Sequence, residues 1–268
     1  MPDSNSDSRL SSLQVILIAP LAGALVTLSL APFDLWPSGI LSCALLAWLL
    51  STCEPPQALW RGWLYGLGMF GSGVSWVYVS IHVHGYAPVP LALTLTALFC
   101  GGLAIFHGLF GWLYVRFVRP LPGGMLIGFA LLWVLLEWLR SWILTGFPWL
   151  LLGYAHVETW IAGWAPIVGV FGLSFICALS GSCLFLAWRS RQPVAIATYG
   201  VIVLTLWVGG SVLKPIQWVA RASEQPLTTA IYQPNVPQEH KWDRQYYYPI
   251  LEQLEAGTAP LLGNDILV

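Results

Sequence analysis

Charged residues are scarce in this chain: only 9% of its 268 residues are Asp, Glu, Lys or Arg, and the formal net charge is -1. So weak a charge balance produces no long-range field that could gather a polyanion, and nucleic-acid binding is therefore disfavoured. Cysteine is also used sparingly. The five cysteines show no CxxC spacing and have no histidine pair beside them, so the sequence predicts neither a metal site nor a cofactor.

Apolar residues are correspondingly abundant. Hydrophobic residues make up 57% of the chain, with 16 Trp, and the mean hydropathy is +0.71. A soluble core of this length cannot hide so much apolar surface. The composition therefore predicts a membrane protein.

Long apolar segments are the units that would cross the membrane. A spanning helix needs about 20 mostly apolar residues, because the hydrocarbon offers no water to exposed backbone groups. Seven segments are predicted to span: Leu13–Leu30, Leu35–Leu50, Trp60–Ile81, Val89–Val118, Met125–Ile143, Ile161–Trp188 and Val194–Leu213. Residues 1–12 would form a leader and residues 13–214 a transmembrane bundle. We also expect close helix packing at Gly62 and Gly66, and at Gly124 and Gly128, because each pair has a four-residue spacing.

The distribution of basic residues predicts the orientation of the bundle. A cytoplasmic N-terminus places six arginines on the inside: Arg9, Arg61, Arg116, Arg119, Arg189 and Arg191. Only Arg140 and Lys214 then lie beside outward-facing ends. This bias matches the positive-inside rule. With an odd number of spans, the residues after Lys214 would lie outside the cytoplasm.

Glu137 and Arg140 are ionisable residues within an apolar segment, and such residues need an explanation. They stand three apart, so they share a helix face and could form a structural polar pair. In one interpretation the pair only anchors the helix end. In the other it holds the following loop, or meets a phospholipid headgroup. Trp149 in that loop is either an interfacial aromatic or a wall for acyl chains.

Three histidines suggest an alternative function. His82 and His84 are two residues apart, which does not suit a helical zinc site, and no acidic residue stands near them. His107 is alone in the fourth apolar segment, where it could act as an intramembrane base or simply pack among aromatic residues. An intramembrane, histidine-dependent acyltransferase is therefore one alternative. A non-enzymatic lipid-binding protein or transporter that uses Glu137 and Arg140 is the other.

Residues 219–268 differ in character from the apolar segments. A short β-rich run begins at Pro226, a polar loop follows, and apolar residues then recur at helical spacing, interrupted by Pro249. The closing NDILV is typical of the start of a buried parallel strand. The order predicts the first β-α portion of an α/β domain that this chain leaves incomplete.

Five stretches carry a resemblance to a known family. They are APFDLWP (31–37), FGSGVSWVYVSI (70–81), LTGFPWLLLGY (144–154), APIVGVFGLSF (165–175) and YQPNVPQEHKWD (232–243). Their content and order resemble the apolipoprotein N-acyltransferases of the bacterial inner membrane. The resemblance implies a helical membrane bundle that carries a nitrilase-like (carbon-nitrogen hydrolase) periplasmic domain. It also implies acyl transfer from a phospholipid to the N-terminal amine of a diacylglyceryl-cysteine lipoprotein.

The implied chemistry uses a Glu-Lys-Cys triad of general base, oxyanion stabiliser and thiol nucleophile. None of the three matches a position in this sequence, and the resemblance places them beyond Val268. The chain by itself is therefore expected to be a truncated, inactive form. The residues carried over are substrate-binding candidates: Trp149, Gln233, Lys241 and Trp242. The partners implied are membrane phospholipid and the apolipoprotein acceptor.

The orientation can be tested with reporter fusions. Alkaline phosphatase fused after residue 230 should be active, because this segment is predicted to lie outside the cytoplasm. The same reporter fused after Arg191 should be inactive. Colony colour and enzyme activity in intact cells would distinguish the two, and the reverse pattern would overturn the predicted orientation.

Overall fold

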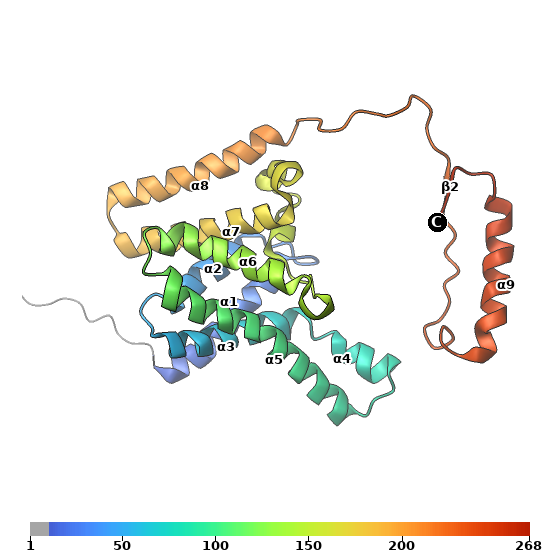
Figure 1. Ribbon diagram of the computed structural model, residues 1–268, viewed down its shortest axis with the longest axis horizontal. Helices are drawn as coiled ribbons and strands as arrows, with labels where there is room; N and C mark the ends of the chain where they lie inside the picture. The colour runs from blue at the N-terminus through green and yellow to red at the C-terminus, as the bar shows by residue number, and fades with distance from the viewer. Residues whose placement is uncertain (1–10) are drawn as a thin grey trace, which may run out of the picture. The chain divides into compact units, whose positions relative to one another are not determined.

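The computed structural model describes residues 11–268. Most of the predicted leader, residues 1–10 with Arg9, lies outside this range. The described residues divide into two units, 11–78 with 88–216 and 79–87 with 217–268. The first unit holds most of the helices that Figure 1 colours from blue to orange. The second holds residues 79–87, α9 and the two strands.

Helix is found at each of the seven segments that were predicted to span. The helices are α1 (Ser12–Ser29), α2 (Pro37–Leu49), α3 (Pro55–Gly73), α4 (Val77–Val79), α5 (Val89–Leu113), α6 (Phe129–Arg140), α7 (Ala165–Ser190) and α8 (Pro193–Leu213). Single π-helical turns cover Ser80–His84, Tyr114–Val118 and Gly124–Gly128, and 3-10 turns cover Ile143–Thr145, Leu152–His156 and Trp160–Trp164.

Local sequence explains where these helices begin. The Ser11 hydroxyl accepts a hydrogen bond from the Gln14 amide, and the Gln14 side chain accepts one from the Ser11 amide, which forms a capping box at α1. Proline stands in the first turn of α2, α3, α5, α7 and α8. Its missing N–H costs nothing there, because the first amides of a helix have no intrahelical partner.

The length of each helix decides which of the predicted spans the structure supports. Within residues 11–268, four helical stretches are long and apolar enough to cross a membrane: Ser12–Ser29, Val89–Val118, Trp160–Ser190 and Pro193–Leu213. A fifth is counted if α3 and residues 77–84, which are bent by 60° at a short break, form one span. Helices α2 and α6 have 13 and 12 residues. The structure thus supports four or five of the seven predicted spans.

Glycines bring α3 into backbone contact with its neighbours. A Cβ on Gly62 would lie 2.1 Å from the His107 carbonyl oxygen of α5, and one on Gly66 would lie 2.8 Å from the Ala104 Cα. On the other face of α3, a Cβ on Gly68 would lie 1.9 Å from the Pro20 carbonyl oxygen of α1. The packing predicted for Gly62 and Gly66 is confirmed. Helices α1, α3 and α5 are therefore held at the short separation that only glycine permits.

Arginines satisfy the free carbonyls where α2 ends. Arg61 donates to the Leu49 carbonyl oxygen at 2.6 Å. Arg119 donates to the carbonyl oxygens of Leu50, Ser51 and Cys53 at 2.8, 3.1 and 3.0 Å. The last carbonyls of a helix lack intrahelical partners and carry partial negative charge, so guanidinium groups stabilise this end.

The second unit contains a β-α-β arrangement. Strand β1 (Thr229–Ala230) pairs in parallel with β2 (Ile266–Leu267), and α9 (Tyr247–Thr258) lies between them in the chain. Short 3-10 turns, Arg244–Tyr246 and Ala259–Leu261, flank α9. Asp265 accepts hydrogen bonds from the amide and the hydroxyl of Thr228, and these bonds lower the pKa of its carboxyl group.

The tight contact between α3 and α5 predicts opposite effects for two alanine substitutions in the same helix. Gly62→Ala should destabilise the bundle by about 1–3 kcal/mol, because the methyl group meets the α5 backbone. Gly71→Ala should be neutral or stabilising by about 0.5–1 kcal/mol, because nothing lies within 4 Å of its Cβ and alanine favours helix. Thermal unfolding in detergent measures both. Equal melting temperatures would contradict the contact.

Candidate functional site

The candidate site lies at the end of α6, where two ionisable side chains turn into the bundle. Glu137 and Arg140 are only 5% and 2% exposed. Trp133, Leu136 and Phe129 share their buried face of the helix, as the 3.6-residue period requires. Charged groups at this depth are costly unless their hydrogen bonds are satisfied. Where those bonds go therefore defines the site.

Glu137 connects α6 to a backbone amide that follows the loop. Its Oε1 accepts hydrogen bonds from the Trp133 indole N–H and from the Leu152 amide, both at 2.9 Å. The Ser174 hydroxyl of α7 lies beside the same carboxylate, and it accepts a hydrogen bond from the Gly153 amide at 2.8 Å. The carboxylate thus ties α6, α7 and the first turn after the loop together.

Arg140 holds the other end of the same loop. Its Nη1 donates to the carbonyl oxygens of Phe147 and Trp149, both at 2.6 Å. The guanidinium carbon lies 5.3 Å from the centre of the Phe70 ring on α3, a distance that suits a cation–π contact. Arg140 thus binds the loop backbone, whereas Glu137 binds one backbone amide after the loop and the Trp133 indole of α6. Both residues hold the segment that follows α6, Arg140 through its carbonyl oxygens and Glu137 through an amide.

The segment between α6 and α7 has an unusual backbone, and residues 147–152 are the part that Glu137 and Arg140 hold. Leu144, Thr145 and Leu150 have φ values of 53°, 77° and 56°. Such values strain residues that carry a side chain, and they persist only where the surroundings impose them. Leu144 is also 93% exposed. The segment is therefore a strained, apolar loop whose shape depends on buried polar contacts.

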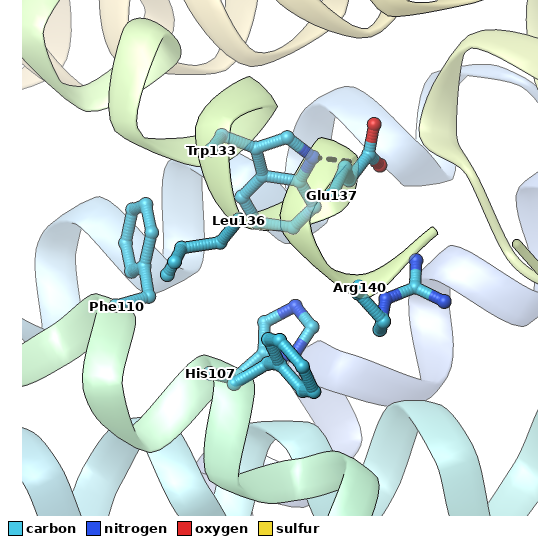
Figure 2. A pocket seen from close by; sticks show the side chains of 7 residues that line it. His107, Phe110, Trp133, Leu136, Glu137 and Arg140 are labelled. Atoms are coloured by element: carbon cyan, nitrogen blue, oxygen red, sulfur yellow. Dashed lines mark hydrogen bonds between the residues drawn. The ribbon is translucent and has the colours of Figure 1, made fainter. Parts of the chain in front are cut away.

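A small cavity lies beneath these residues. Figure 2 shows His107 facing the space below Trp133, Glu137 and Arg140. The space measures about 10 Å³, which is about the size of one water molecule. The His107 Nδ1, the Glu137 Oε2 and the Arg140 Nη2 are buried and have no hydrogen-bond partner in the structure. The cavity is too small for an acyl chain, and His107 packs instead against Tyr65, Phe70 and Trp133.

A larger groove opens between α5 and the strained loop. Its volume is about 510 Å³, within the usual range for small-molecule sites. Arg140 is the one charged residue that lines it. The other residues of this groove, which we call the α5 groove, are Leu98, Phe99, Gly102, Leu103, Ile105, Phe106, Ile143, Leu144, Thr145, Gly146 and Phe147. An apolar trough with a guanidinium group in its wall suits a molecule with a long hydrocarbon part and a polar end.

Trp149 belongs to a row of aromatic rings beside the α5 groove. Its ring lies 5.3 Å from that of Phe147 and 5.9 Å from that of Trp76. Phe147 in turn meets Phe99 of α5 edge-on at 5.2 Å. Trp149 is 49% exposed. Trp149 is thus linked through Phe147 to Phe99 in the wall of the α5 groove.

The other three candidates belong to the second unit. Gln233, Lys241 and Trp242 are all exposed. Trp242 is 82% exposed, and the turn that carries it and Lys241 is closed by a hydrogen bond from the Lys241 amide to the Gln238 carbonyl oxygen. An indole so open to solvent is costly unless it meets another apolar surface.

The histidines do not form a metal site in the part of the chain that the structure describes. Among residues 11–268, no three His, Cys, Asp or Glu side chains come together in a way that could hold a metal ion. The His82 ring shares a 2.8 Å hydrogen bond with the Ala87 carbonyl oxygen. This contact gives His82 a local structural role.

Sequence reasoning missed Ser174 at the site and the buried His156 a few residues after the loop. Ser174 stands in α7, 37 residues after Glu137, and nothing in its sequence surroundings marks it as a neighbour of that carboxylate. His156 is fully buried between Trp36 and Trp207. Its position just after the TGFPWLLLGY stretch was the only available signal.

Comparisons with known proteins identify relatives of this chain. A family model for the N-terminal domain of apolipoprotein N-acyltransferases matches residues 22–183. The apolipoprotein N-acyltransferase of Pseudomonas aeruginosa (strain LESB58) is 47% identical over 94% of this chain and 50% of the relative. Those of Azotobacter vinelandii and Coxiella burnetii are 46% and 38% identical, over 85% and 94% of this chain and 44% and 52% of the relatives. The chain spans about half the length of the curated relatives it matches.

The hydrogen bonds of Glu137 predict how its variants behave. Glu137→Gln keeps a carbonyl oxygen for Trp133 and Leu152, so the fold should lose little stability. Glu137→Leu leaves two buried N–H groups unsatisfied, at a cost of about 1–3 kcal/mol each. Arg140→Leu should likewise free the carbonyls of Phe147 and Trp149.

Melting temperature and hydrogen–deuterium exchange of residues 147–152 measure both effects. Arg221→Leu, on an exposed arginine of the second unit, is the control. Faster exchange confined to the loop in the Leu variants would support its attachment to α6. Exchange equal to that of wild type in both Leu variants would refute it.

Proposed function

The chain belongs to the apolipoprotein N-acyltransferase family, and we propose that it supplies the membrane-embedded, phospholipid-docking part of such an acyltransferase. The substrate pair would be a phospholipid acyl donor and the N-terminal amine of a diacylglyceryl-cysteine lipoprotein. The observation that carries this proposal is the α5 groove, which is mainly apolar and has Arg140 as the one charged residue in its lining. A phospholipid has the same division into a long apolar part and a charged end.

We place the protein in the bacterial inner membrane as a multi-pass bundle of seven spans over residues 13–214. The N-terminus would be cytoplasmic and residues 219–268 periplasmic, as the start of a nitrilase-like domain. The arginine distribution supports this orientation. The parallel pairing of β1 with β2 across α9 supports an α/β domain. Helices α2 and α6 would span only with the help of the segments that flank them.

In this proposal the acyl chain lies in the α5 groove and its ester end points toward Arg140. The apolar walls would take the chain out of contact with water and with other lipids. The guanidinium group would attract the phosphate or the ester oxygens, since Nη1 is already engaged with the loop and Nη2 has no partner. Glu137 and Arg140 would also act as positioning residues, because they fix the loop that forms one wall.

The second unit would meet the substrates from the aqueous side. Lys241 carries a positive charge and Trp242 an exposed indole on adjacent positions of one turn. This combination suits the interface between lipid headgroups and acyl chains. We propose that Trp242 contacts the acyl region, while Lys241 and Gln233 contact polar groups of the donor or acceptor.

The chemical step is assigned by the family resemblance to a Glu-Lys-Cys triad that matches no position of this chain. The five cysteines here are all buried. A thiol needs a neighbouring base and access to substrate to act as a nucleophile, so none of the five is proposed as catalytic. The contribution of this chain would be to bind and orient the donor.

A chimera tests the proposed function. This chain would replace the matching half of the Pseudomonas aeruginosa relative, and the chimera would be expressed in cells depleted of their own apolipoprotein N-acyltransferase. The expected result is growth and N-acylated lipoproteins, detected by mass spectrometry. A folded, membrane-inserted chimera without N-acylation would contradict the proposal and favour a lipid-binding protein without acyl transfer.

Filling the α5 groove should reduce transfer in that chimera. A Cβ on Gly102 meets nothing within 4 Å, so Gly102→Leu can occupy the groove without disturbing the fold. We expect at least a tenfold loss in kcat/KM for the phospholipid, carried mainly by KM, because the side chain competes with the acyl chain. Gly200→Leu on α8, where a Cβ also meets nothing within 4 Å, is the matched control. Equal loss in both variants would exclude the groove as the donor site.

A further inference from the structure

A second groove lies between α2 and α7. It is lined by Leu41, Ala44, Leu45 and Trp48 of α2 and by Leu184, Phe185 and Trp188 of α7, and its volume is about 390 Å³. We call it the α2–α7 groove. Ala44 and Phe185 form its floor and are 7% and 3% exposed, whereas Leu41, Leu184 and Trp188 on the rim are 45%, 49% and 57% exposed. The groove is hollow at this point because the side chain of Ala44 is small.

The two helices run in the same direction along this groove. A Cβ on Gly181 would lie 2.5 Å from the Cys43 Cβ and 2.8 Å from the Ile40 carbonyl oxygen, so this level of α7 faces residues 40–43 of α2. One to two turns later, Trp48 and Trp188 stand near the last residues of α2 and α7. The groove therefore runs from the middle of the bundle to a mouth flanked by two tryptophans. Tryptophans at this position are typical of the membrane–water interface.

Positive charge gathers at the same end of the bundle. Arg189 follows Trp188 directly, Arg191 stands two residues later, and both are exposed. Arg61 and Arg119 hold the carbonyls at the end of α2. Against these four arginines, residues 41–61, 114–124 and 181–193 contain one acidic residue, Glu54. The mouth of the groove is strongly cationic.

We propose that the α2–α7 groove binds one anionic phospholipid of the membrane, with an acyl chain in the groove and its phosphate at Arg189 and Arg191. The site is separate from the α5 groove and does not depend on acyl transfer. Under the proposed orientation it faces the cytoplasmic leaflet, which is the leaflet whose anionic lipids attract basic segments beside helix ends.

The size of the groove favours a lipid over a protein helix. A helix about 10 Å wide that rises 1.5 Å per residue fills roughly 120 Å³ per residue. The 390 Å³ of the groove would therefore hold only about three residues of a helix. An acyl chain is thin enough to lie along the floor, and its headgroup would reach the arginines that follow Trp188.

Native mass spectrometry of the purified chain tests the proposal with defined lipids. Phosphatidylglycerol and phosphatidylcholine with identical acyl chains would be added in equal amounts. We expect one phosphatidylglycerol to be retained in preference to phosphatidylcholine. The Arg189→Gln and Arg191→Gln variants should each weaken this preference about fivefold. Arg221→Gln is the matched control and should retain it.

Two further variants test the groove itself. Ala44→Leu fills the floor, and Leu41→Trp fills the groove from its exposed rim, so the second stays informative where the first disturbs the fold. Both should abolish preferential retention, while Ala197→Leu on the exposed face of α8 should not. Equal retention of the two lipids by the wild-type chain, or unchanged retention in the filled variants, would overturn the proposal. A dimer of the chain that Ala44→Leu dissociates would also overturn it, since the groove would then be a contact between copies.

Discussion

The need of buried backbone groups for hydrogen-bond partners is the constraint on which the structure around α6 depends. Where α6 ends, the chain leaves regular helix, and its backbone groups need partners inside the protein. Arg140 supplies donors for two carbonyls, and Glu137 supplies an acceptor for one amide. The cost of burying these two charged groups is thus offset by the backbone groups that they satisfy. The position of Phe147, which belongs to the lining of the α5 groove, depends on this arrangement.

The sequence predicted the elements whose signal is local and repetitive. Apolar runs marked every helix of the bundle, and the four-residue spacing of Gly62 and Gly66 marked the contact with α5. The strand, loop and helix order after residue 226 could also be read, because its polar composition differs from that of the spans. The number of spans was predicted less well, since the structure supports four or five of the seven. The 60° bend after α3 lies beside the stretch GSGVS (71–75), which is too short to interrupt the apolar segment when hydropathy is averaged over a whole span.

The site could be predicted in part. Glu137 and Arg140 were evident as ionisable residues in an apolar segment, and Trp149 followed from the family resemblance. Their real partners could not be predicted, because the main groups they bind are backbone atoms of Phe147, Trp149 and Leu152, which no residue type identifies. Ser174 could not be predicted either, since its place beside Glu137 depends on how α7 packs against α6.

The glycine contacts of α3 have a consequence for how the α5 groove can change shape. Helix α5 is locked to α3 through Gly62 and Gly66, and α3 to α1 through Gly68, so three helices form one stiff block. The opposite wall belongs to the loop that Glu137 and Arg140 of α6 hold by hydrogen bonds. The α5 groove therefore has one rigid wall, the face of α5, and one wall that can move, the loop. Any widening to admit a second chain or a larger molecule must come from the loop, while the face of α5 stays in register.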